Sequence, residues 1–351
     1  DKVLIARNCH KSVLHGLVLT GAEPIWFMPE INPQWSIFNA VSADVILSEL
    51  EKNSDIKAVI ITSPTYEGVT SDIKAISEVC RLKNVKLIVD EAHGALKSFA
   101  PTIFGENAVK LGADIAVESL HKTCGAPNPC AILLSAGTIS QEKIQNSLNL
   151  INTTSPSYPM LAAIEAVISF LASDKGKKKI DKLLYDISEL KKTFLFEKNI
   201  EFCDFNDPTK LLVKVKGLSG FDLSDILFDE FDIEDELTNS FASLLLTGIG
   251  TAKHKLKQLE KALKIIVSTD YSCPAEEASC PLILPNCELL PREAFFAEKV
   301  ELPVEEAFGN ICGETISEYP PGIPILILGE KISHEHTNYL KQNRKLIKVV
   351  R

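Results

Sequence analysis

The chain has 351 residues and a mass of 38.6 kDa, a length that favours two or three domains over one compact core. Its composition, 45% hydrophobic and 24% charged, excludes a disordered or fibrous protein. The formal charge of −10 argues against nucleic acid or an anionic membrane as the main partner, and no apolar run reaches the roughly 18 residues that a membrane helix needs.

The first half of the chain predicts a layered α/β fold. Continuous apolar runs, rather than alternating ones, indicate strands that are buried on both faces of a sheet. They alternate with helical patterns, notably Ala43–Lys52 with Ser42 as its N-cap and Asp72–Leu82 with Ser71 as its N-cap. This order predicts a mainly parallel, doubly wound sheet with its chemistry at the carboxyl ends of the strands. The predicted strands are Lys2–Ala6, Pro24–Phe27, Ala58–Thr62, Lys86–Val89, Ile115–Val117 and Ala131–Leu134. Because the first of them opens the chain, we expect a preceding segment of this domain to be absent here.

The pattern changes after about residue 156. A long apolar helix over Met160–Leu171 is followed by another amphipathic helix that reaches about Glu197. The lysines between the two helices predict a basic linker, which contains Lys175, Lys177, Lys178 and Lys179. A smaller α+β unit then follows, with predicted elements at Lys210–Val215, Asp222–Phe231, Phe241–Leu246 and Lys253–Ile266.

The end of the chain predicts a third unit. The segment from Asp270 to Leu290 is rich in Pro, Cys and Ser, a composition typical of a linker. The residues from Arg292 to Arg351 then predict a terminal segment that includes a short strand and a helix. We therefore predict three domains: a large domain over residues 1–158, a small α+β domain over 159–269 and a C-terminal domain over 270–351.

The nine cysteines indicate in which cellular compartment the protein works. They are odd in number and form no C-x-x-C pair, which indicates reduced thiols and a cytoplasmic protein. Cys273, Cys280 and Cys287 recur every seven residues, but zinc sites favour tighter spacings, so we expect no metal site.

Three short clusters follow predicted strands and contain groups that can carry chemistry. Lys122, in Ser119-Leu120-His121-Lys122-Thr123, ends a buried strand, where a partly desolvated lysine has a lowered pKa and can attack a carbonyl. Asp90 and His93 follow another strand, and an aspartate there can keep a pyridine nitrogen protonated. His10 follows the first strand and could lie flat on an aromatic ring.

Each cluster also has a plain structural interpretation. Lys122 could be a surface lysine, Asp90 a helix cap and His10 a structural hydrogen-bonding residue. Function is favoured because all three follow strands of one predicted parallel sheet, so their side chains meet at one edge.

These clusters resemble the Orn/Lys/Arg decarboxylase family, the bacterial branch with the fold type I of aspartate aminotransferase and pyridoxal 5′-phosphate (PLP) as cofactor. The resemblance extends over nearly the whole chain. It is carried by Arg7-Asn8-Cys9-His10-Lys11-Ser12, Ser63-Pro64-Thr65-Tyr66-Glu67-Gly68-Val69, Asp90-Glu91-Ala92-His93-Gly94-Ala95, Ser119-Leu120-His121-Lys122-Thr123, Thr154-Ser155-Pro156-Ser157-Tyr158, Pro291-Arg292-Glu293-Ala294-Phe295-Phe296 and Tyr319-Pro320-Pro321-Gly322-Ile323-Pro324.

The resemblance implies a decarboxylase of arginine, lysine or ornithine in polyamine metabolism, active as a homodimer or a higher homo-oligomer. Lys122 would bind PLP covalently, Asp90 would pair with the pyridine nitrogen and His10 would stack on the ring. Ser119 and His121 would help to hold the phosphate, which the turn Thr153-Thr154-Ser155 would reach from a neighbouring subunit. Either Lys122 or His93, which would lie near the leaving carboxylate, would return a proton to the product.

Two alternatives stay open from the sequence. One is a different fold type I reaction, an aminotransferase or a lyase. The other is a non-catalytic paralogue that serves as an oligomer subunit. It is suggested by the prolines Pro127 and Pro129 after the lysine cluster, and by the lack of a Gly/Ser/Thr phosphate-binding turn before His10.

Overall fold

The computed structural model describes residues 1–204, 207–269, 271, 284–318 and 323–351. Its largest element is a six-stranded sheet with the strand order β2-β1-β5-β6-β7-β8. All neighbouring strands are parallel except β8, which runs antiparallel to β7. The mainly parallel α/β sheet predicted from the sequence is therefore confirmed. The strands are β1 (Lys2–Ala6), β2 (Glu23–Phe27), β5 (Ile56–Thr62), β6 (Lys86–Asp90), β7 (Ile115–Ser119) and β8 (Ala131–Ser135).

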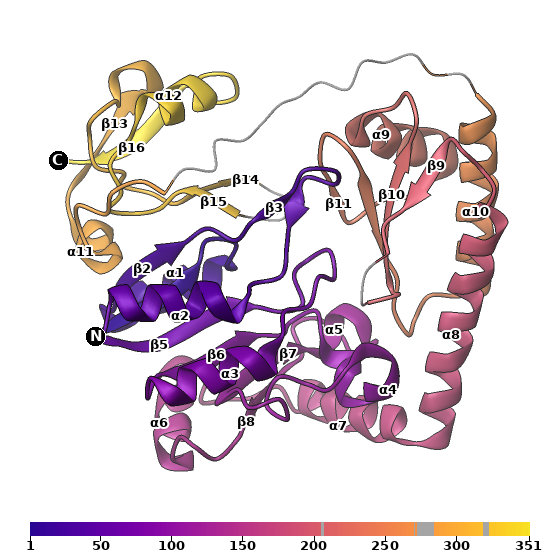
Figure 1. Ribbon diagram of the computed structural model, residues 1–351, viewed down its shortest axis with the longest axis horizontal. Helices are drawn as coiled ribbons and strands as arrows, with labels where there is room; N and C mark the ends of the chain where they lie inside the picture. Colours follow the sequence, from indigo (N-terminus) through magenta and orange to yellow (C-terminus); the bar gives the residue numbers. More distant parts are fainter. Residues whose placement is uncertain (205–206, 270, 272–283, 319–322) are drawn as a thin grey trace.

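Helices cover both faces of this sheet (Figure 1). On one face, α2 (Ala43–Lys52) and α3 (Ile73–Leu82) bury Ile46 and Ile76 against Val59 and Leu87 of the strands. On the other face lie α1 (Lys11–Thr20) and, further along the sheet, α7 (Tyr158–Ala172). Shorter connecting elements are η1 (Ala95–Ser98), α4 (Pro101–Phe104), α5 (Leu120–Thr123) and α6 (Gln141–Ile151).

Side-chain caps set the start of these helices. The hydroxyl of Ser42 accepts a hydrogen bond from the Val45 N–H and caps α2, as predicted. The predicted cap of α3 is wrong, because Asp72 takes that place and accepts from the Ala75 N–H at 3.0 Å. Ser71 instead accepts from the Val41 N–H and so joins the two loops that precede α2 and α3.

The predicted basic linker is also wrong. The four lysines lie inside α8 (Asp174–Thr193), which begins directly after Ser173. The Ser173 hydroxyl accepts from the Gly176 N–H, and Ile180, Leu183 and Ile187 then supply a buried stripe at helical spacing. The lysines continue the same helix on its solvent side, so their charge does not interrupt it.

A second, four-stranded sheet has the order β11-β12-β10-β9. One face packs on α8, α9 and α10, and the other buries Leu212 and Leu244 against Trp35 of the hairpin β3–β4. This hairpin ties the second sheet to the first. The elements are β3 (Ile31–Asn32), β4 (Ile37–Phe38), β9 (Ile200–Phe202), β10 (Lys210–Val215), β11 (Leu237–Thr238), β12 (Ser243–Leu246), α9 (Gly220–Phe231) and α10 (Lys253–Ser268).

The C-terminal residues form a small unit beside α1, drawn in orange and yellow in Figure 1. Its helix α12 precedes its last strand, and the predicted turn at 319–322 lies outside the described residues. No helix in the described part of the chain is both long and apolar enough to cross a membrane. The elements are α11 (Pro291–Phe296), β13 (Lys299–Pro303), η2 (Val304–Glu306), β14 (Ile316–Glu318), β15 (Ile323–Leu326), α12 (His334–Leu340) and β16 (Leu346–Val350).

Candidate active site

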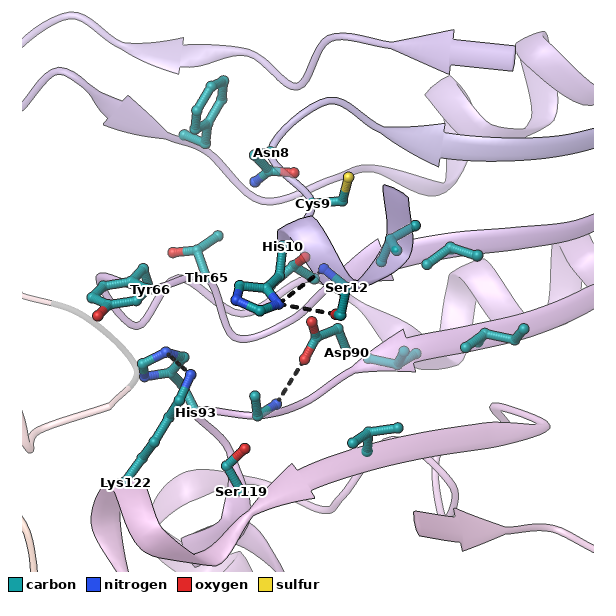
Figure 2. A pocket seen from close by; sticks show the side chains of 18 of the residues that line it. Asn8, Cys9, His10, Ser12, Thr65, Tyr66, Asp90, His93, Ser119 and Lys122 are labelled. Atoms are coloured by element: carbon teal, nitrogen blue, oxygen red, sulfur yellow. Dashed lines mark hydrogen bonds between the residues drawn. The ribbon is translucent and has the colours of Figure 1, made fainter. Parts of the chain in front are cut away.

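A cavity of about 470 Å³ opens at the carboxyl ends of β1, β5, β6 and β7 (Figure 2). The chain passes from β1 to β2 on one side and to β5 on the other, so the cavity lies where the strand order reverses. Its size is that of a cavity for a small ligand. All six residues predicted for the site line it: His10, Asp90, His93, Ser119, His121 and Lys122.

Lys122 projects into this cavity from α5, the short helix that follows β7. Its Nζ lies 2.8 Å from Nε2 of His93 and 5.7 Å from the centre of the Tyr66 ring. Burial lowers the pKa of Lys122, against the opposing charges of Asp90 and Glu236. A lysine with a lowered pKa loses its proton more readily, and the uncharged amine is the form that attacks a carbonyl.

Asp90 is the last residue of β6, and its Oδ1 accepts the Ala92 N–H at 3.1 Å. This bond fixes the carboxylate at the strand end. Figure 2 shows it directed toward His10 and Ser12, on the side of the cavity opposite Lys122. The site therefore presents an anion and an amine from two neighbouring strands.

His10 is the N-cap of α1. Its Nδ1 accepts the Ser12 N–H at 3.3 Å and lies 2.9 Å from the Ser12 hydroxyl. Burial lowers the pKa of His10, so the neutral ring prevails at pH 7. The ring is thus a fixed, uncharged aromatic surface at the edge of the cavity.

Ser119 and His121 border the cavity from β7 and α5. Ser119 joins the two strand ends, because its backbone N–H donates to the Ala92 carbonyl. Nδ1 of His121 lies 2.8 Å from the carbonyl oxygen of Cys130. The loop that contains Pro127 and Pro129 ends at Cys130, so this loop supports the His121 ring.

Two further residues of the site were missed in the sequence analysis. Lys210, the first residue of β10, is fully buried and places its Nζ 3.1 Å from Nδ1 of His93. Tyr66 packs its ring 4.4 Å from the His93 ring, and its hydroxyl donates to Glu236. The signal for Lys210 was a lysine directly before the apolar run Leu211, Leu212 and Val213, whereas Tyr66 was quoted only as part of a motif.

The chemistry of these groups fits PLP. The cavity offers an amine for an aldehyde, a carboxylate for a protonated ring nitrogen and an imidazole surface for an aromatic ring, in Lys122, Asp90 and His10. It also contains Oδ1 of Asn8, a buried oxygen that has no hydrogen-bond partner among the described residues. The described residues contain no group of three or more His, Cys, Asp or Glu side chains that could hold a metal ion, and Cys273 and Cys280 lie outside them.

Comparison with protein families gives two matches. The description "Orn/Lys/Arg decarboxylase, major domain" matches residues 1–216, and "Orn/Lys/Arg decarboxylase, C-terminal domain" matches residues 277–350. The arginine decarboxylase of Halalkalibacterium halodurans is 32% identical over 98% of this chain and 73% of its own length. The arginine decarboxylase of Bacillus subtilis is 33% identical over the same shares of the two chains.

Solved structures agree with the fold. The lysine decarboxylase of Francisella novicida superposes with a TM-score of 0.84, covering 100% of this chain and 66% of its own, at 20% sequence identity. The constitutive lysine decarboxylase of Escherichia coli superposes with a TM-score of 0.83 at 18% identity, over 100% of this chain and 67% of its own. These likenesses show a shared architecture of the two sheets and the C-terminal unit.

Proposed function

Because the chain belongs to the Orn/Lys/Arg decarboxylase family, whose members are PLP-dependent decarboxylases of basic amino acids, we propose that its substrate is arginine and its products are agmatine and CO2. Arginine is favoured because four relatives that are 31–33% identical are arginine decarboxylases, whereas the inducible lysine decarboxylase of Escherichia coli is 23% identical. The observation that best supports this cavity as the active site is the 2.8 Å contact between Lys122 Nζ and His93 Nε2.

We propose that Lys122 is the residue that binds PLP and later returns a proton to the product. Its amine is uncharged more readily than that of an exposed lysine, because burial disfavours the ammonium form. His93 is next to it and neutral, since burial and the charges of Lys210 and Lys122 hold the pKa of His93 well below its ordinary value. A neutral imidazole can accept a proton from Lys122 at Nε2 or donate one there.

PLP, when bound, supplies an electron sink for the electrons released as CO2 leaves. Asp90 would favour a proton on the ring nitrogen by its negative charge, and His10 would hold one face of the ring. Ser119 and His121 would bind the phosphate. His93 and Ser119 are buried, and low exposure strengthens the charge interactions of a group.

We further propose three domains divided near residues 158 and 269, and a cytoplasmic homodimer. Free thiols support the compartment: every cysteine that the structure describes is unpaired, and most are buried. The turn Thr153-Thr154-Ser155 is exposed, as a segment that reaches a neighbouring subunit must be.

The proposal is tested by incubation with PLP, reduction with borohydride and peptide mapping, followed by product assays on arginine, lysine and ornithine. We expect the label on Lys122, amine release from arginine, and kcat/KM for arginine at least about tenfold above that for lysine, a difference of about 1.4 kcal/mol. Lys122→Ala should abolish both label and product, whereas Lys143→Ala, an exposed lysine of α6, should change neither. A preference for lysine would overturn the substrate, and a keto acid product would overturn the reaction.

A further inference from the structure

Glu236 lies at the edge of the candidate active site, one residue before β11 of the second sheet. Its Oε1 accepts a hydrogen bond from the hydroxyl of Tyr66, which lines the cavity. We propose that Glu236 is a specificity-determining residue, whose carboxylate binds the cationic end of the substrate, the guanidinium group of arginine. The inference deepens the proposed function, because it assumes that Lys122 marks the reacting end of the cavity.

The side chains of the cavity follow one another in an order that suits an extended substrate. Asp90 lies at one end, and Figure 2 shows Lys122, His93 and Tyr66 together at the other. Nζ of Lys122 lies 5.7 Å from the centre of the Tyr66 ring, and the centre of the His93 ring lies 4.4 Å from it. The hydroxyl at the tip of the Tyr66 ring contacts Glu236. A substrate whose amine takes the place of the Lys122 amine can therefore extend along the Tyr66 ring and reach Glu236.

Tyr66 and Glu236 together offer the groups that a guanidinium binds. A guanidinium is planar, stacks on aromatic faces and donates two parallel N–H bonds to a carboxylate. Tyr66 supplies an aromatic face that already lies within cation–π distance of the Lys122 amine. Glu236 supplies the carboxylate, and the single bond from Tyr66 leaves it with free lone pairs for a second partner.

The charge of Glu236 is free to meet a substrate, whereas neighbouring acids are engaged. No ion pair among the described residues includes Glu236. Asp235, the residue before it, accepts the Ser243 hydroxyl at 2.7 Å. Glu67 also lines the cavity, but it is buried and its Oε2 accepts the Thr65 hydroxyl at 2.8 Å. Glu236 is exposed, so an incoming cation reaches it without displacing a buried contact.

The carboxylate of Glu236 is held in place before any substrate arrives. Its backbone N–H donates to the Leu244 carbonyl of β12 at 2.8 Å, which fixes the main chain to the second sheet. The Tyr66 hydroxyl fixes the side chain, and the Tyr66 ring itself packs against His93. A preorganised acceptor of this kind favours a cationic substrate over a neutral one of the same shape.

Equilibrium binding of two amines tests the inference without turnover. Agmatine and N-carbamoylputrescine have the same length and the same reactive amine, but the second has a neutral urea in place of the guanidinium. The ratio of their affinities for the PLP-loaded protein, measured by isothermal titration calorimetry, therefore reports on the distal end alone. We expect the wild type to bind agmatine at least about tenfold more tightly. Glu236→Gln keeps an acceptor for the Tyr66 hydroxyl and should bring the two affinities within about twofold of each other.

Steady-state kinetics on arginine give the second test. Glu236→Gln removes a contact made equally by the bound substrate and the transition state, so KM should rise about tenfold while kcat changes less than about threefold. The variant should fold, because Glu236 is exposed and glutamine has nearly the same shape. Glu234→Gln, at an exposed acid two positions earlier, is the matched control and should leave KM and the agmatine preference unchanged.

The outcomes separate this inference from the function on which it rests. A folded Glu236→Gln protein that still prefers agmatine tenfold would overturn the inference. Loss of the preference in Glu67→Gln, with Glu236→Gln like the wild type, would assign the cation to Glu67 and overturn it as well. A protein that prefers agmatine through Glu236 but forms no agmatine from arginine would overturn the proposed function alone, because the binding ratio does not depend on decarboxylation.

Discussion

Arg7 and Glu330, which are 323 positions apart in the sequence, form a completely buried ion pair between the end of β1 and the C-terminal unit. Nη2 of Arg7 lies 2.8 Å from Oε2 of Glu330, and Nε donates to the carbonyl of Pro324 at 3.2 Å. Asn8 and His10 follow Arg7 directly and line the cavity. The C-terminal unit therefore holds the first strand at the point where it enters the site.

Breaking this pair should destabilise the protein strongly. Glu330→Gln leaves the Arg7 cation buried without a counter-charge, so we expect a loss of about 3–5 kcal/mol in the free energy of unfolding, measured by urea titration. The double variant Arg7→Met/Glu330→Leu should recover most of that loss. Glu298→Gln, at an exposed pair with Arg351, should leave the unfolding midpoint unchanged. A Glu330→Gln protein as stable as the wild type would contradict the structural role of the pair.

His93→Gln should lower kcat without preventing PLP from binding to Lys122. The amide keeps a polar group of similar reach but cannot exchange a proton near neutral pH, and general acid–base catalysis contributes about 10²–10⁴ to a rate. Steady-state kinetics would measure the fall in kcat, and borohydride labelling would show that PLP still binds to Lys122. The matched control is His15→Gln on the exposed side of α1. Unchanged kcat would remove His93 from the proton path.

Asp90→Asn should preserve the backbone contact with the Ala92 N–H but remove the negative charge at the strand end. We expect kcat/KM to fall about 10²–10³-fold, the size of effect seen when one preorganised electrostatic partner of a reacting group is removed. Asp181→Asn, an exposed position on α8, serves as the control. Activity near that of the wild type would mean that the Asp90 charge does not act on the cofactor.

Glu118 should make the protein less stable as the pH rises. Burial raises the pKa of this carboxyl to about 7, well above its value in an unfolded chain, so the folded state binds more protons between about pH 4.5 and pH 7. The contribution of Glu118 to the free energy of unfolding is therefore greatest below pH 4.5. It falls as the pH rises through 7, by up to about 3 kcal/mol.

Glu118→Gln mimics the protonated form and tests this dependence. We expect urea unfolding of the variant to show a gain in stability at pH 8 and a flatter profile between pH 5 and pH 8. Glu165→Gln, at an exposed position of α7, should retain the wild-type profile. The prediction fails if both variants lose stability in parallel across that range.

The local parts of the fold could be predicted from sequence because their signals are local. Continuous apolar runs identified all six strands of the large sheet, and helix α2 was predicted at its observed bounds with Ser42 as its cap. Lys122, Asp90 and His10 were brought together in the prediction by one rule, since each follows a parallel strand. The structure places all three around one cavity.

The remaining features depend on contacts between distant parts of the chain. Lys210 and His93 are 117 positions apart, and nothing near Lys210 indicates which ring its amine would meet. The lysines of α8 were assigned to a linker because their charge outweighed the apolar stripe that begins at Ile180. Arg7 was quoted in a motif, but its partner lies in the last unit of the chain.

The contribution of β10 sets a minimum size for any transplanted version of this site. A designer who copied β1, β5, β6 and β7 with their following loops would carry over Asp90, His93 and Lys122 in a self-contained sheet. That graft would lack Lys210, which contacts Nδ1 of His93 from the second sheet and is completely buried. A working copy therefore has to include Lys210 on β10 and the loop of Gly68, where a Cβ atom would lie 2.8 Å from Cγ of Lys210. Both sheets have to be transplanted together.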